Sequence, residues 1–258
     1  MRKYLRISLI LITFCQLFSL SAAEKYSLEM LNAAEDISFI SQRIAKSYFY
    51  VNQNIQRKQA TEIIQNSLEL LDQYIDQIDT DYNVEPNSEE SNMLLFLSFT
   101  RDEFRETLSK KYSKDRGALV LDFSESLLEG ASLLAQRNVN EENLNQANLS
   151  KVKRMAFLLE RIGKYYIAFK AGYSDFNNLV QQRKAIKDFD LALAQLSEHP
   201  IYMNEHKNTL AQLNKFWPIA RKFYNSIEAG NTPRLVFTST THLEDMLKRI
   251  ERHHYASN

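Results

Sequence analysis

The chain has 258 residues, of which 44% are hydrophobic, and it carries 32 basic and 32 acidic residues. That length allows one large core or two small ones, and the balanced charge provides no field that would attract nucleic acid, so no nucleic-acid partner is expected. The chain has only five glycines and four prolines, and it is rich in residues that favour helices, so we expect an all-α fold.

The first 23 residues have the pattern of a cleaved secretory signal peptide. A basic segment (1–6) precedes an apolar run of 14 residues (7–20), and small residues (21–23) form a cleavage site before Glu24. An uncleaved anchor is the alternative. Cleavage would remove three basic and no acidic residues, leaving a net charge of −3, and would remove Cys15, the one cysteine. We therefore expect a periplasmic protein, soluble after cleavage, that is stabilised by packing alone.

Four helices are predicted in the first half of the chain. Their apolar residues recur at intervals of three and four, as on one face of a helix, and their expected ranges are 27–56, 60–78, 92–112 and 119–136. Residues 79–91 have the composition of a loop, and the Asn- and Glu-rich residues 138–148 are the natural boundary between the halves.

Four more helices are predicted in the second half, at about 149–171, 176–197, 204–227 and from the break at 230–233 to about 253. Gly172 is expected to cap the first of these at its C-terminus, and Asp175 to cap the next at its N-terminus. The His199–Pro200 pair should end the second. Pro218 should kink the third or split it after Trp217.

Two stretches of the chain resemble each other at a fixed offset of 118 residues. In Ser38–Lys46 and Ala156–Lys164, the Arg, Ile and Lys positions recur, and the correspondence continues into the next helix, where Asp72 matches Asp190. A repeat of this size indicates tandem domains. We therefore expect two tandem antiparallel four-helix bundles, eight helices in all, with the first module at 24–141 and the second at 142–258.

The repeated Arg and Asp are equidistant from the expected turns, so Arg43 should face Asp72 and Arg161 should face Asp190 across the helix pair of each module. An Arg beside an apolar stripe needs a partner, because an unpaired charge in a low dielectric is costly. One interpretation is a structural ion pair that fixes helix register. The second is that the guanidinium also holds a small anion or carboxylate, and the third is a solvated Arg without a role.

These stretches resemble the PilJ-type module, the N-terminal sensory domain of type IV pilus methyl-accepting chemotaxis transducers. The residues of the first copy that carry the resemblance are Asn32, Ala34, Ile40, Ser41, Gln42, Arg43, Ile44, Ala45 and Lys46. Those of the second copy are Arg154, Leu158, Arg161, Ile162 and Lys164. The resemblance implies a helical sensor, but Ser38 and Ala156 stand where relatives that sense nitrate have an Arg, so nitrate recognition is not expected.

No catalytic constellation is evident, so an enzyme is not expected. The five histidines form no i, i+4 pair, and the sequence contains no nucleophile elbow or glycine-rich phosphate loop. We predict no metal site and no cofactor. Tyr48 and Tyr166 belong to aromatic groups that follow the motif Arg in each copy, where they either pack in the core or form a pocket wall.

We therefore expect a non-enzymatic sensory or adaptor protein that binds either a small ligand, with an anion or carboxylate as the candidate, or the helices of a membrane receptor or kinase. The alternative is a structural accessory of an envelope or type IV pilus system without a small ligand. The sequence does not distinguish a monomer from a homodimer. The candidate ligand-binding residues are Arg43, Arg161, Gln42, Glu160, Ser38, Tyr48 and Tyr166, and the candidate structural partners are Asp72 and Asp190.

Overall fold

The computed structural model describes residues 28–81, 87–138 and 144–256, and this part of the chain forms nine helices and no strand. The all-α prediction is confirmed. The predicted signal peptide lies outside the described residues. After the N-terminal helix (28–52), the order is α2 (Arg57–Asp81), α3 (Glu89–Ser109), α4 (Lys114–Asn138), α5 (Leu144–Lys170), α6 (Phe176–Glu198), α7 (Pro200–Glu205), α8 (Lys207–Asn225) and α9 (Pro233–Ala256).

The helix ends follow local chemistry that the sequence signals. Gly172 adopts a left-handed conformation with φ 95° directly after α5, which glycine reaches without a side-chain penalty. The Asp175 side chain accepts a hydrogen bond from the backbone N–H of Asn178 at 3.0 Å and so caps α6. Pro200 occupies the first turn of α7, where its missing N–H has no intrahelical partner to lose.

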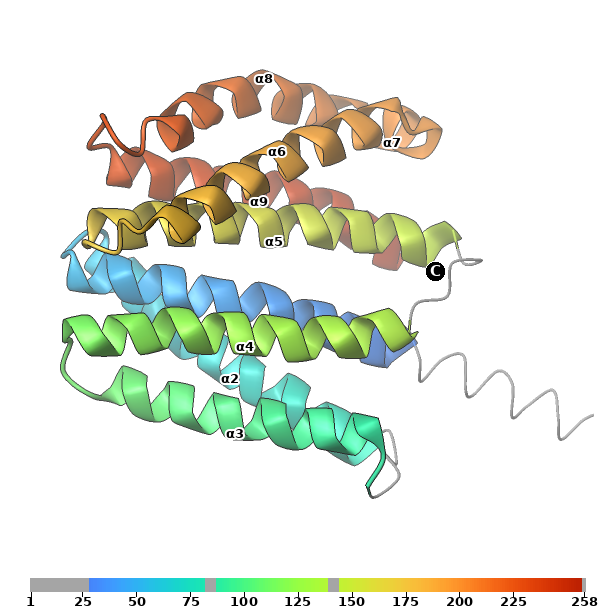
Figure 1. Cartoon of the computed structure of the whole chain (residues 1–258). Helices are drawn as coiled ribbons and strands as arrows, with labels where there is room; N and C mark the ends of the chain where they lie inside the picture. The colour runs from blue at the N-terminus through green and yellow to red at the C-terminus, as the bar shows by residue number, and fades with distance from the viewer. Residues whose placement is uncertain (1–27, 82–86, 139–143, 257–258) are drawn as a thin grey trace, which may run out of the picture.

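The prediction of one helix over 204–227, kinked or split at Pro218, is wrong in position. The break falls at His206, between α7 and α8, and α8 continues through Pro218. Pro218 lies on the exposed side of α8, so the carbonyl that loses its helical hydrogen bond can bond to water instead. Figure 1 shows α8 as a curved helix, as expected where solvent-side bonds are lengthened or missing.

Two groups of buried apolar side chains form the interior. The first joins the N-terminal helix, α2, α3 and α4 and also takes in Ile167, Ala168, Tyr173 and Phe237 from α5, the following turn and α9. The second joins α5, α6, α7, α8 and α9. Figure 1 shows the N-terminal helix and α4 beside α5 and α9 in the middle of the molecule, with α3 and α8 at opposite sides. The first core therefore extends across the junction of the two halves.

None of the helices in the described part of the chain combines the length and apolarity needed to cross a membrane.

Candidate ligand site between the two motif helices

The N-terminal helix and α5, which carry the two repeated stretches and are called the motif helices below, pack side by side and parallel. Asp36 contacts Lys153 at 3.1 Å and Arg43 contacts Glu160 at 2.8 Å, and both pairs are 117 residues apart in sequence. This separation nearly equals the repeat offset, so equivalent positions lie at the same height. The contacts are also reciprocal, because Arg161 reaches Gln42 at 3.5 Å. The motif helices are therefore related by an approximate twofold axis along their length.

Arg43 belongs to a buried charged cluster formed with Lys46, Glu160 and Glu244. Its Nε lies 2.8 Å from Glu160 and its Nη2 lies 2.6 Å from Glu244. Lys46, with a side chain only 2% exposed, lies 2.5 Å from Glu160 and 3.7 Å from Glu244. Gly163 of α5 leaves room for Lys46, because a Cβ there would lie 2.9 Å from its Cδ. The cluster thus joins the N-terminal helix to α5 and α9.

The two carboxyl groups of this cluster differ in proton affinity. Burial alone would raise the pKa of Glu160, but the charges of Lys46 and Arg43 outweigh it and lower that pKa to about 2. Burial and the charge of Glu160 raise the pKa of Glu244 to about 7, against the opposing effect of Lys46 and Arg43. The pair therefore carries its first negative charge at low pH and completes its second only near neutral pH.

This difference predicts a pH dependence that belongs to Glu244. Because its pKa is raised on folding from 4.5 to about 7, the stability that it contributes is present below pH 4.5 and is lost as the pH rises through about 7. We expect the free energy of unfolding of the natural chain to fall by about 3 kcal/mol across this window, and that of Glu244→Gln to show no such fall. Urea titrations at closely spaced pH values would measure it, and parallel profiles for the two proteins would contradict it.

Arg161 belongs to a second cluster, with Lys164, Glu125, Gln42 and Gln181. Its Nη1 lies 2.8 Å from Glu125 and its Nη2 lies 3.1 Å from Gln181, while Lys164 also pairs with Glu125. Burial tends to raise the pKa of Glu125, but the charges of Lys164 and Arg161 lower it to about 2. Burial, with the charge of Arg161, lowers the pKa of Lys164 to about 8. One carboxylate thus pairs with the fully buried Lys164 and the partly buried Arg161.

The predicted Arg–Asp pairs are wrong. Asp72 instead forms an ion pair with Arg105 of α3, and Asp190 accepts a hydrogen bond from Trp217 Nε1 at 2.6 Å and lies 3.3 Å from Arg221, both on α8. The reason is geometric: equidistance from a turn fixes the height along a hairpin but not the direction in which a side chain leaves the helix. The motif arginines point toward the other half of the molecule.

Tyr48 and Tyr166 pack in the interior, as in the core-packing alternative. Tyr48 lies edge-on to Phe49, with ring centroids 5.5 Å apart, and burial raises its pKa to about 12. The Tyr166 hydroxyl accepts a hydrogen bond from the backbone N–H of Thr232 at 3.2 Å. Neither residue lines the cavity described next.

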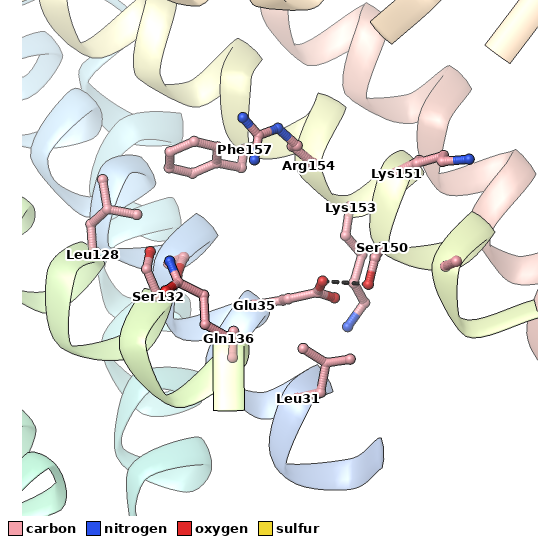
Figure 2. A pocket seen from close by; sticks show the side chains of 13 residues that line it. Leu31, Glu35, Leu128, Ser132, Gln136, Ser150, Lys151, Lys153, Arg154 and Phe157 are labelled. Atoms are coloured by element: carbon pink, nitrogen blue, oxygen red, sulfur yellow. Dashed lines mark hydrogen bonds between the residues drawn. The ribbon is translucent and has the colours of Figure 1, made fainter. Parts of the chain in front are cut away.

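A cavity of about 410 Å³ lies between the motif helices and α4, on the N-terminal side of the charged clusters. It is lined by Leu31, Glu35 and Ser38 of the N-terminal helix, Leu128, Ser132, Ala135 and Gln136 of α4, and Ala147, Ser150, Lys151, Lys153, Arg154 and Phe157 of α5. Figure 2 shows Glu35 directed toward Ser150 at the lower edge and Phe157 beside Arg154 at the upper edge. Of the predicted binding residues, only Ser38 lines it.

The polar side chains that line the cavity differ in whether they already have a hydrogen-bond or ion-pair partner in the protein. The Ser150 hydroxyl donates to Glu35 at 2.5 Å, and burial raises the pKa of Glu35 despite that hydrogen bond and the nearby Lys153. Lys153 is paired with Asp36. The exposed Arg154 side chain, by contrast, forms no ion pair or hydrogen bond with the described residues. Lys151, which is also exposed, has no such partner among the described residues either, so these two side chains are the cations of the lining that remain available to a ligand.

Sequence reasoning missed most of this lining, although a signal was present. The repeat offset pairs Glu35 with Lys153, and both residues line the cavity. If the two motif helices are assumed to pack side by side and parallel, the residues near Glu35 lie opposite those near Lys153.

In comparisons with known proteins, no family model, no curated protein sequence and no solved structure matches the chain.

Proposed function

We propose that the protein is an exported, PilJ-like sensory or adaptor protein of two tandem four-helix modules, which binds a small ligand in the cavity between its motif helices. The observation that carries this proposal is the cavity itself. Its volume of about 410 Å³ is within the range of small-molecule sites, and such sites prefer the junctions between structural units. The signal-peptide pattern and the PilJ resemblance of the sequence support export and a sensory role.

The position of the cavity connects it to the contacts that hold the two halves together. Phe157 lines the cavity, and its ring centroid lies 5.9 Å from the Arg161 guanidinium carbon of the second cluster. Glu35 and Lys153 line the cavity, and Lys153 also pairs with Asp36 across the motif helices. A ligand that displaced these side chains would favour one packing of the motif helices over another, which is the differential binding that a sensor requires.

A ligand screen by thermal unfolding tests this function. The panel contains nitrate, acetate, succinate and medium-chain carboxylates, with their neutral amides or alcohols. A compound present at 100 times its Kd should stabilise the folded protein by about 2.7 kcal/mol. Ser132→Leu, which fills the cavity, should abolish the shift, whereas Ser126→Leu, also on α4 but outside the lining, should retain it.

If no compound raises the Tm and Ser132→Leu changes only the stability, the ligand-binding proposal fails.

A second function, as an envelope or pilus accessory that binds a partner helix without a small ligand, is favoured by one observation. Leu95, Phe96 and Phe99 are exposed together on α3, and an apolar patch of this kind is typical of protein–protein contact. It predicts that a photocrosslinker at Phe99 captures a defined receptor, kinase or pilus subunit, and that one at the exposed Ile219 does not.

A further inference from the structure

We infer that the cavity binds an amphipathic organic monoanion, a medium-chain carboxylate in type, with its carboxylate at Arg154 and its apolar body between the motif helices and α4. This inference rests on the proposed function and names the ligand class of the same cavity. It is carried by the lining, which combines an apolar wall with Arg154, a cation that has no ion-pair or hydrogen-bond partner among the described residues.

The apolar wall comes from all three helices. Leu31 of the N-terminal helix, Leu128 and Ala135 of α4, and Ala147 and Phe157 of α5 line the cavity. Figure 2 shows Leu128, Phe157 and Leu31 at separated points around it. An inorganic anion would leave these surfaces facing water, whereas a hydrocarbon body would cover them. Each methylene buried against them should tighten binding about fourfold.

The charges favour an anion over a cation. Glu35 is the only acid among the described lining residues, and its carboxyl group already accepts the hydrogen bond from Ser150. Three basic residues line the same cavity. Lys153 is paired with Asp36, and Figure 2 shows Lys151 directed away from the cavity, whereas Arg154 lies beside Phe157 at its edge. A guanidinium in that position can hold a carboxylate through two parallel hydrogen bonds.

Arg154 also borders a smaller hollow between α5 and α6, which is lined by Asp188 and Leu191 among others. Asp188 is paired with Lys184 at 3.2 Å on its own helix, so it does not occupy the Arg154 guanidinium. Arg154 therefore lies at the rim of the larger cavity without a counterion in the part of the chain that the structure describes, and the ligand would provide one.

Calorimetric titration of the purified protein with sodium decanoate, below its micellar concentration, tests the inference. Decanoate should bind with one site per chain, and hexanoate should bind about 250-fold more weakly because four methylenes, at about fourfold each, are missing. Decyltrimethylammonium and decanol should bind more weakly than decanoate. Arg154→Gln should weaken decanoate binding about tenfold, and Ser132→Leu should abolish it. The control Arg183→Gln, which breaks an exposed ion pair between α6 and Glu228, should leave it unchanged.

The other outcomes separate this inference from the proposed function. Preference for decyltrimethylammonium, or tight binding of nitrate or acetate with no effect of chain length, overturns the ligand class while the cavity remains a ligand site. Decanoate binding that survives Ser132→Leu shows adsorption elsewhere and also overturns the inference. If neither decanoate nor any small anion of the screen binds, both the inference and the proposed function fall.

Discussion

Replacing Glu160 with Gln is expected to lower the free energy of unfolding by about 3 kcal/mol, the loss typical when one partner of a buried ion pair is removed. The Glu160 side chain is fully buried and serves both Arg43 and Lys46. Without its charge, Glu244 at 3.7 Å would be the remaining carboxylate beside Lys46 among the described residues. A positive charge in an apolar interior has no water to replace the lost partner, which is why the effect should be large.

The matched control is Glu228→Gln. Glu228 pairs with Arg183 at 2.7 Å, but its side chain is 60% exposed, and exposed pairs contribute at most about 1 kcal/mol. Urea unfolding of the two variants and the natural chain measures both effects. Equal stabilities for the two variants would show that the cluster around Glu160 is not the buried junction described above. The pH profile offers a second check, since loss of Glu160 removes a like charge and should lower the pKa of Glu244.

Trp217→Ala is expected to cost about 4 kcal/mol, as for other large-to-small changes of aromatic residues in a core. The Trp217 side chain is 4% exposed, its ring lies 4.1 Å from that of Phe189, and its Nε1 donates to Asp190 at 2.6 Å. The substitution would leave a cavity in the second core and remove the hydrogen bond of a partly buried carboxylate.

The repeat itself provides the control for this prediction. Phe99 stands 118 residues before Trp217 and is 63% exposed on α3, so Phe99→Ala should change the free energy of unfolding by less than about 0.5 kcal/mol. Chemical unfolding followed by circular dichroism measures both variants. A loss for Phe99→Ala that approaches the loss for Trp217→Ala would contradict the different environments of the two positions.

Much of the helical organisation could be predicted from the sequence because it depends on local chemistry. The apolar spacing of Ile37, Ile40 and Ile44 predicts a helix with one buried face, and all three side chains are buried. Gly172 and Asp175 mark a helix end and a helix start because their conformational and hydrogen-bonding preferences act within a few residues. Such signals do not depend on how the helices later pack.

The site could not be predicted in the same way because it depends on the contact between the two copies. The equivalence of Arg43 and Arg161 is visible in the sequence, but their partners Glu160 and Glu125 belong to helices of the other half of the chain. The cavity exists because small residues of α4 and α5, among them Ser132 and Ala147, face the N-terminal helix at one level. Periodicity identifies such residues as part of a helix face without showing which faces meet.

A crystal structure of the protein grown with decanoate tests the central claim most directly, because it shows where the ligand lies. We expect electron density for the carboxylate at Arg154 and for the hydrocarbon chain along Phe157 and Leu128, with the Arg43–Glu160 pair retained. An empty cavity with decanoate bound elsewhere, or a cavity filled by the protein's own side chains, would contradict a ligand site between the motif helices.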